Sequence, residues 1–300
     1  MENQEEKHFI SAYIMGGLGN QLFQIFAAIA TSIRQNKLFI FQYSIDSPSI
    51  TPRPTYWHNF LFHLQKYTTK DNQYISNGYI QKFPLCRIDN HNYIEIPNKN
   101  TNMLLFGFFQ TYKYFIDYFD DIKKLMRFDS IKQDIKKEFN KYFINNFITV
   151  SIHFRFSDYK KLIGTYEILN ANYYIKAVNN VLVRDLNKNI RFLYFFEEED
   201  KEDVDEIIKK IKFFTFTQDQ YNVEHKIIDH NIPDWKQMIL MSCCNHNIIA
   251  NSTFSYWGAL FNEYNYKIVC YPDKWFGHKE PIRQKSMFDM FPSKWDSITS

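Results

Sequence analysis

The first 43 residues of this 300-residue chain restrict its fold more than any other segment. Phe9 to Met15 is an apolar run typical of a buried strand, and Gly16-Gly17-Leu18-Gly19 forms a glycine-rich turn. Apolar residues then recur at helical spacing before a second apolar run, Leu38 to Tyr43. Strand, tight turn, helix and strand make the βαβ unit of a parallel sheet. The N-terminal half is therefore predicted to begin as a Rossmann-like domain.

A second series of alternating elements begins near the middle of the chain. Phe147 to Phe154 indicates a new strand, and helix and strand patterns then alternate as far as Ile268 to Tyr271. A chain of this length usually holds two domains of about 150 residues each. We predict two Rossmann-like α/β domains, 1–145 and 146–300, with the last helix crossing back to the first. Such domains bind ligands at the carboxyl ends of their strands, which predicts an active site in the interdomain cleft.

The charge balance indicates no highly charged partner. The sequence has 36 basic and 33 acidic residues and a formal net charge of +3. This balance favours neither nucleic-acid binding nor an electrostatic membrane anchor. Met1 to Lys7 is polar and acidic, and no run of about 18 apolar residues occurs, so we expect a cytoplasmic protein without an integral membrane segment. The composition gives no indication of the oligomeric state.

The glycine turn contains the first candidate binding residues: Gly17, Gly19, Asn20 and Gln21. Backbone N–H groups at a strand-to-helix turn favour an anion such as a diphosphate. Alternatively, the glycines only allow the chain to turn sharply. A dinucleotide-binding fingerprint would need a third glycine where Leu22 stands and an acidic residue near the end of the second strand. The turn therefore disfavours an NAD enzyme.

The segment His153 to Asp158 leaves the first strand of the second domain and carries three ionisable side chains. Arg155 offers a planar fork of N–H donors that suits phosphate oxygens and a departing nucleoside diphosphate. His153 and Asp158 are the nearest candidates for a general base. The alternative is an Arg155–Asp158 ion pair beside a histidine that belongs to the core.

A second strand-to-helix junction carries Asn251, Ser252, Thr253 and Phe254. One helix cap needs one hydroxyl, whereas several crowd this turn, as suits phosphate and ribose oxygens. Ordinary capping is the alternative. Asn251-Ser252-Thr253 also matches a glycosylation sequon, but it follows an apolar strand that we expect to be buried.

Three segments together resemble one known family. Met238 to Ala259 is similar to the signature of the alpha-1,2-fucosyltransferases, glycosyltransferase family 11. Gly16 to Gln24 resembles the N-terminal motif of that family, and Gly107 to Phe115 resembles a third family segment. These matches extend from about residue 11 to residue 276.

The resemblance implies a GT-B arrangement and an inverting transfer of L-fucose from GDP-fucose to a glycan hydroxyl, forming an alpha-1,2 linkage on a terminal galactose or similar sugar. It implies no metal or other cofactor, a GDP-binding second domain, an acceptor-side first domain, and a diphosphate held by Arg155. The family pattern His-x-Arg-Arg-x-Asp is altered here, because Phe156 replaces the second arginine and Ser157 the following glycine. The family's Ser-Asp-Asp aligns with Phe196-Glu197-Glu198. Position 156 is expected to point toward the same phosphates as Arg155.

Three other functions remain compatible with parts of the pattern. The loss of the second arginine allows a catalytically inactive protein that binds a GDP-sugar or a glycan, or a transferase for a different GDP-sugar. The βαβ signal alone would allow an oxidoreductase.

Asp203-Val204-Asp205 matches a metal-binding Asp-x-Asp, but it lies in an acidic run that opens a helix, where carboxylates complement the helix dipole. We therefore expect no metal there.

Overall fold

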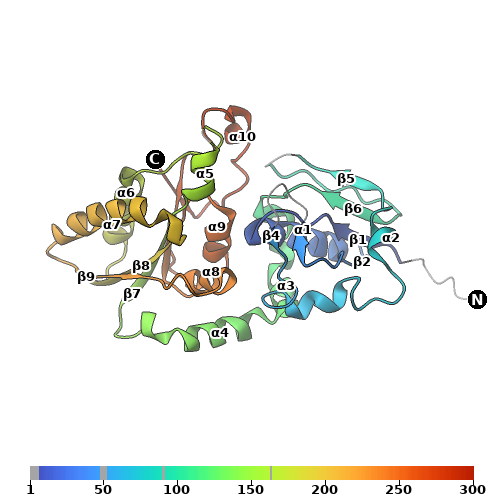
Figure 1. Cartoon of the computed structure of the whole chain (residues 1–300), viewed down its shortest axis with the longest axis horizontal. Coiled ribbons are helices and arrows are strands. Elements are labelled where there is room, and N and C mark those ends of the chain that lie inside the picture. The colour runs from blue at the N-terminus through green and yellow to red at the C-terminus, as the bar shows by residue number, and fades with distance from the viewer. Residues whose placement is uncertain (1–6, 48–52, 90–91, 163) are drawn as a thin grey trace, which may run out of the picture. The chain divides into compact units, whose positions relative to one another are not determined.

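The computed structural model describes residues 7–47, 53–89, 92–162 and 164–300 of the chain. The chain divides into two compact units (Figure 1). Unit 1 contains Met1–Ser130 and Ser286–Phe291, and unit 2 contains Ile131–Lys285 and Pro292–Ser300. Each unit has its own parallel sheet covered by helices, so the predicted α/β fold is confirmed. No helix among these residues is long and apolar enough to cross a membrane.

Unit 1 is built on a four-stranded parallel sheet in the order β2-β1-β6-β5. Its strands are β1 (Phe9–Ala12), β2 (Leu38–Phe39), β5 (Leu85–Arg87) and β6 (Met103–Phe106). The buried helix α1 (Leu18–Arg34) packs against β1 and against α3 (Phe119–Met126). The region predicted as loops and short elements contains an antiparallel pair, a 3₁₀ helix and one helical turn: β3 (Asp46–Ser47), β4 (Arg53–Pro54), Phe62–Tyr67 and α2 (Asn77–Ile80).

Glycines follow the two central strands of this sheet. Gly16 after β1 and Gly107 after β6 adopt positive φ angles of 78° and 146°. A Cβ atom at Gly107 would lie 2.1 Å from the Ile88 carbonyl oxygen, so no other residue fits there without moving the backbone. Glycine thus lets two family segments, Gly16–Gln24 and Gly107–Phe115, leave adjacent strands in tight turns.

Unit 2 is built on a six-stranded parallel sheet in the order β12-β11-β10-β7-β8-β9. Its strands are β7 (Ile148–His153), β8 (Asn189–Phe195), β9 (Asn222–Ile227), β10 (His246–Ile248), β11 (Val269–Pro272) and β12 (Asp296–Ile298). The chain runs from β7 outward to β8 and β9, and then returns to β10 on the other side of β7. The carboxyl ends of β7 and β10 therefore form the topological switch point, where ligands of such sheets bind.

The helices of unit 2 alternate with its strands, as in a doubly wound fold. They are α5 (Ser157–Lys161), α6 (Ala171–Arg184), α7 (Lys201–Phe216), α8 (Asp234–Ser242), α9 (Thr253–Leu260) and α10 (Pro281–Lys285). Helix α6 packs against α7, and α8 packs against α9. The return to unit 1 occurs after α10, through the non-helical segment Ser286–Phe291, in which Asp289 accepts from the Tyr93 N–H at 3.0 Å and pairs with Lys113.

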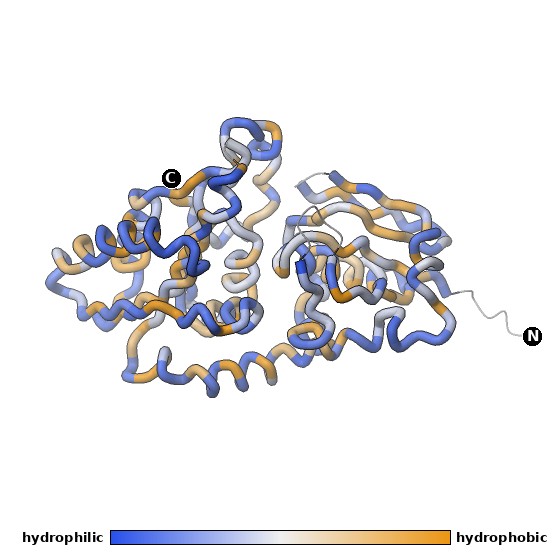
Figure 2. The backbone as a smooth tube through the Cα atoms, viewed as in Figure 1, coloured by the Kyte–Doolittle hydropathy of each residue, from blue (hydrophilic) through white to orange (hydrophobic). Residues whose placement is uncertain are grey.

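The units divide within α4 (Phe128–Glu138), fifteen residues before the predicted boundary at residue 145. Helix α4 alternates between hydrophobic and hydrophilic residues along its length (Figure 2). Lys132 pairs with Glu263 at 3.1 Å, and Glu138 pairs with Lys236 at 2.8 Å, so α4 is attached to unit 2. This charged helix therefore begins unit 2 rather than ending unit 1.

Arg191 on β8 attaches the next segment to unit 2. Its side chain is buried and donates to the carbonyls of Tyr142 and Ile144 at 3.0 and 2.8 Å, and to Glu224 at 2.9 Å. A buried guanidinium with these partners cannot be shortened without leaving acceptors unsatisfied.

We predict that Arg191→Met lowers the stability of unit 2 by about 2–4 kcal/mol, because two carbonyls and a carboxylate lose their donor. Urea unfolding followed by circular dichroism measures the change. Arg184→Met is the matched control, since Arg184 pairs with Asp296 at the surface, where an ion pair contributes about 1 kcal/mol or less. Equal losses in both variants would contradict the role given to Arg191.

Candidate active site

The two candidate segments of unit 2 meet at the switch point between β7 and β10. His153 Nδ1 lies 3.0 Å from the Ser255 hydroxyl, and the Tyr159 hydroxyl donates to the Asn251 carbonyl at 2.7 Å. The His153 ring also lies 5.5 Å from that of Phe254. The start of α9 is thus joined to the end of β7 by side-chain contacts as well as by the sheet.

His153 is a buried, neutral histidine in this arrangement. Its burial, with a smaller contribution from the charge of Arg155, lowers the pKa of His153 to about 3. The Ser255 hydroxyl donates to the Ser252 carbonyl at 3.3 Å, so it accepts from Nδ1–H of His153. His153 therefore positions the first turn of α9.

Arg155 is half-buried between two carboxylates. Its Nε and Nη2 donate to both Asp158 oxygens at 3.0 and 2.8 Å, and its Nη1 contacts Glu197. Burial works to lower the pKa of Arg155, but the hydrogen bond and charge of Asp158 outweigh it and raise that pKa. Three N–H groups are used in this way and a guanidinium carries more, so Arg155 keeps donors without a partner among the described residues.

This geometry contains the predicted Arg155–Asp158 pair, and it also assigns a function to Asp158. Both carboxylate oxygens of Asp158 accept from Arg155, which fixes the plane of the guanidinium. A guanidinium held in one orientation is preorganised for an anion. Asp158 is thus placed to orient Arg155.

The expectation for Phe156 is wrong. Its side chain is only 3% exposed and belongs to the same apolar core as Phe154 and Phe196. Side chains along an extended segment alternate in direction, so Arg155 faces outward while its neighbours on both sides face inward. An arginine at position 156 would have to enter this core, and the position does not point toward the partners of Arg155.

Asp200 holds the backbone that presents Arg155. It is 1% exposed, and its carboxylate accepts from the Phe156 N–H at 3.0 Å and from the Ser157 hydroxyl at 2.7 Å. The sequence analysis did not select Asp200 or Glu197 as site residues. The alignment of Phe196-Glu197-Glu198 with a family motif was the available signal for Glu197, because these residues directly follow β8, the neighbour of β7.

The four candidates after β10 differ in exposure. Asn251 is fully buried, and its side-chain amide donates to the carbonyls of Glu167 and Trp275, both at 2.8 Å. This burial leaves no room for a glycan at the sequon. Ser252 caps α9 and is 8% exposed, whereas Thr253 and Phe254 are only half-buried. The accessible groups at this helix start are therefore Thr253 and Phe254.

The candidate residues in the glycine turn of unit 1 also differ in exposure, some being buried and others partly exposed. Gln21 is fully buried and donates to the carbonyls of Gly16 and Pro54 at 2.8 and 2.9 Å. Gly19 is buried within α1, whereas Gly17, at the helix N-cap, and Asn20 are partly exposed. The Asn20 side chain accepts from Gln110 at 2.8 Å. This contact joins the first and third family segments.

Asp203 lies in the first turn of α7 and pairs with Lys160. Within residues 7–47, 53–89, 92–162 and 164–300, no cluster of three or more histidine, cysteine, aspartate or glutamate side chains could hold a metal ion.

Comparison with known proteins identifies the family. The profile described as Glycosyl transferase family 11 matches residues 12–285. An alpha-1,2-colitosyltransferase of Escherichia coli is 29% identical over 314 residues, covering 96% of this chain and 98% of that protein. The O-antigen biosynthesis glycosyltransferase WbnK of Escherichia coli is 26% identical over 301 residues, covering 88% and 93%. A crystal structure of POFUT1 in complex with GDP has a TM-score of 0.49 at 10% identity, covering 90% of this chain and 99% of that one.

The fold and site place the chain among α/β proteins whose ligands bind at the carboxyl edge of a parallel sheet. The chain belongs to glycosyl transferase family 11, whose profile matches most of its length. It is therefore a glycosyltransferase, and the resemblance seen in the sequence is confirmed.

The buried His153 predicts a specific acid sensitivity. Its pKa falls from an ordinary 6.5 to about 3 on folding, so its contribution to stability is complete above pH 6.5 and is lost as pH falls toward 3. The free energy of unfolding of the native protein should decrease by up to about 1.4 kcal/mol per pH unit more than that of His153→Asn in this window. Urea unfolding at a series of pH values measures the slopes. His278→Asn, which removes an exposed histidine of the same unit, controls for the loss of one ring, and parallel slopes in the native protein and His153→Asn would refute the assignment.

Proposed function

We propose that this glycosyltransferase moves L-fucose from GDP-fucose to a sugar hydroxyl with inversion, forming an alpha-1,2 linkage. The observation that carries the proposal is that the segment of Arg155, which follows β7, meets the start of α9 at the switch point of unit 2, where His153 and Ser255 are hydrogen-bonded. A guanidinium and a helix N-terminus both attract a diphosphate. Family membership supplies the reaction class, and the three family segments support GDP-fucose as the donor.

The proposed chemistry depends on charge stabilisation of the leaving group. The acceptor hydroxyl attacks the anomeric carbon while the bond to the diphosphate breaks, and negative charge develops on the departing GDP. The N–H groups of Arg155 that Asp158 and Glu197 do not use, together with the positive N-terminal end of the α9 dipole, stabilise this charge. Phe254 offers an apolar surface beside them, and Gly17 and Asn20 are the proposed substrate-binding residues of unit 1. No metal ion is included in this proposal.

A second donor deserves the same test, because one relative is named an alpha-1,2-colitosyltransferase. Colitose is fucose without the 3-hydroxyl group, so its GDP ester presents the same nucleotide and diphosphate. A site that hydrogen-bonds the 3-hydroxyl would reject the deoxy sugar strongly, whereas a site that packs against that carbon would discriminate weakly. Turnover of GDP-fucose and GDP-colitose at equal concentrations separates the two donors.

We predict that GDP raises the melting temperature far more than UDP or CMP does. A ligand at about 100 times its dissociation constant stabilises the folded state by about 2.7 kcal/mol. Thermal-shift measurements with and without EDTA should give the same GDP effect, followed by turnover of GDP-fucose under both conditions. Equal stabilisation by UDP would argue against a GDP-sugar donor, and an EDTA-inactivated enzyme restored by manganese would argue against metal independence.

We predict that Arg155→Ala lowers kcat by about 100- to 1000-fold, because the developing charge on the diphosphate loses a preorganised donor. Arg155→Lys should be partly active, since it keeps the charge without the planar fork. Arg184→Ala is the matched control, since it removes an arginine that pairs with Asp296 on the same unit. Steady-state kinetics with melting curves of all three variants give the result, and an Arg155→Ala enzyme within about tenfold of the native rate would make Arg155 a structural residue.

A further inference from the structure

The C-terminal half of α7 combines cations with exposed aromatic rings. Residues Lys209–Phe216, here named the α7 tip, contain three lysines, three phenylalanines and no acidic residue. Ile211 and Thr215 face the core, whereas Phe213 and Phe216 are 73% and 82% exposed. Exposed rings on adjacent turns of one helix form an apolar patch of the kind that marks a contact surface.

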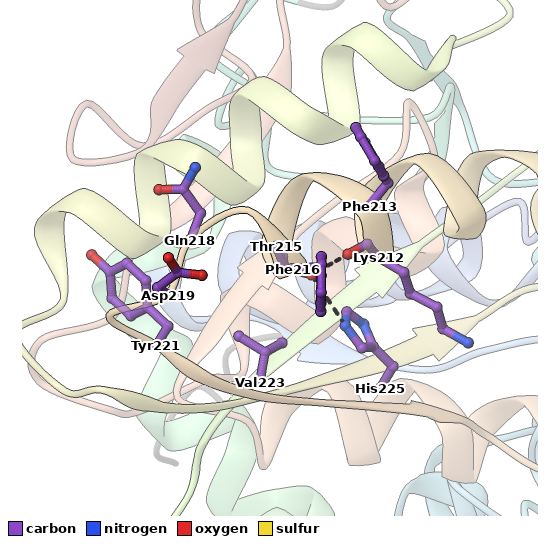
Figure 3. A pocket seen from close by; sticks show the side chains of 9 residues that line it. All are labelled: Lys212, Phe213, Thr215, Phe216, Gln218, Asp219, Tyr221, Val223 and His225. Carbon is purple, nitrogen blue, oxygen red and sulfur yellow. Dashed lines mark hydrogen bonds between the residues drawn. The ribbon is translucent and has the colours of Figure 1, made fainter.

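Phe213 forms a ridge between two hollows. One hollow, of about 600 Å³, lies between the end of α7 and β9, and Phe216, Tyr221 and Val223 contribute to its lining (Figure 3). The other, of about 440 Å³, is lined by Ile175 of α6 together with Phe213 and Phe214. The α7 tip therefore presents projecting rings beside two recesses, of which the smaller is mainly apolar and the larger has both polar and apolar side chains in its lining.

The floor of the larger hollow is fixed by a chain of hydrogen bonds. The Thr215 hydroxyl donates to the Lys212 carbonyl at 3.0 Å, so it accepts from His225 Nε2 at 3.2 Å (Figure 3). The Tyr194 hydroxyl lies 2.7 Å from Nδ1 of the same ring. Burial, with the charge of Lys212, lowers the pKa of His225 to about 4. His225 is therefore neutral near pH 7, and the cations of the surface are the lysines.

Charge is segregated along α7. Its acidic residues, Glu202, Asp203, Asp205 and Glu206, all precede the tip. Glu206 pairs with Lys209 at 2.6 Å, and Asp219, beyond the helix, contributes to the lining of the larger hollow. Lys210 and Lys212 therefore supply most of the positive charge of the tip. Attraction to the helix dipole accounts for acids at the start and lysines toward the end. It does not account for two phenylalanine rings held in water. The lysines and the rings together match a surface that is both anionic and apolar.

We propose that the α7 tip docks on an anionic lipid surface, its exposed rings entering the interfacial layer and its lysines facing lipid phosphate groups. Lys210 and Lys212 leave the helix in different directions from each other and from Lys209, the partner of Glu206, because successive residues are about 100° apart. This spread suits a continuous layer of negative charge better than a single carboxylate on a protein partner. Long lysine stems also let the ammonium groups reach the phosphates while the rings are buried.

The position of the tip is compatible with activity at the surface. Helix α7 runs from the carboxyl end of β8 back to the start of β9, so its tip lies at the amino edge of the unit 2 sheet. Arg155 lies at the opposite, carboxyl edge. Docking through the tip therefore leaves the candidate site of unit 2 uncovered.

Co-sedimentation of the full chain with lipid vesicles tests this proposal. We expect binding to phosphatidylcholine vesicles that contain about one third phosphatidylglycerol and little binding to pure phosphatidylcholine, with the bound fraction falling as salt rises. Phe213→Ser/Phe216→Ser and Lys210→Glu/Lys212→Glu should each reduce partitioning about tenfold or more. Phe62→Ser/Tyr74→Ser removes two exposed aromatic rings of unit 1 as the matched control and should bind as the native protein does.

Melting curves confirm that the variants fold, and light scattering without vesicles reports their mass. Native binding by Phe213→Ser/Phe216→Ser, or equal binding to both vesicle types, would overturn the proposal. A dimer that dissociates in Phe213→Ser/Phe216→Ser would overturn it as well, by assigning this face to a second copy of the chain.

Discussion

The parallel pairing of β7 with β10 is the constraint on which the rest of unit 2 depends. These strands are separated by almost 100 residues, and their register brings His246 opposite Val150 and Ile248 opposite Ile152. The chain must leave both strands at the same edge, in opposite directions across the sheet. Arg155 and the start of α9 therefore become neighbours whatever the loops between them contain. The His153–Ser255 hydrogen bond then fixes the distance between the two segments.

The site has a buried polar layer beneath an accessible one. In unit 2, His153 and Asn251 are buried and use their side chains to hold turns or helix starts in place. Arg155 and Thr253 are partly exposed, and the buried residues hold in place the segments that carry them. A buried polar group without partners is costly, so the buried layer is specific in geometry and tolerates few substitutions. A family motif thus contains residues that contact ligand together with residues that only position them.

Much of this arrangement could be predicted from the sequence, because βα alternation and the two strand-to-helix junctions have a clear periodicity. The exposure of individual side chains was harder to predict, since a sequence motif does not show which of its residues face the core. Phe156 shows this limit: the alternation of Phe154, Arg155 and Phe156 indicates that only the central residue faces outward, but the family pattern suggested otherwise. The unit boundary lies before residue 145 because Lys132 attaches α4 to unit 2, and Arg191 attaches the segment that follows α4, through contacts distant in sequence. Asp200 gave no local signal, since its partners lie more than 40 residues away.

Net charge describes this protein poorly because its charges are locally segregated. The overall value of +3 conceals a cationic α7 tip and an acidic surrounding of Arg155. Asp158 and Glu197 together carry more charge than Arg155, so they weaken the attraction of the guanidinium for an anion. Their effect is orientation, since they hold the fork in one plane at a cost in electrostatic attraction. Affinity for the proposed diphosphate must then come largely from short-range donors, namely the N–H groups of Arg155 that Asp158 and Glu197 do not use. Such donors act only on a ligand whose oxygens are correctly placed, which makes the site selective for geometry more than for charge.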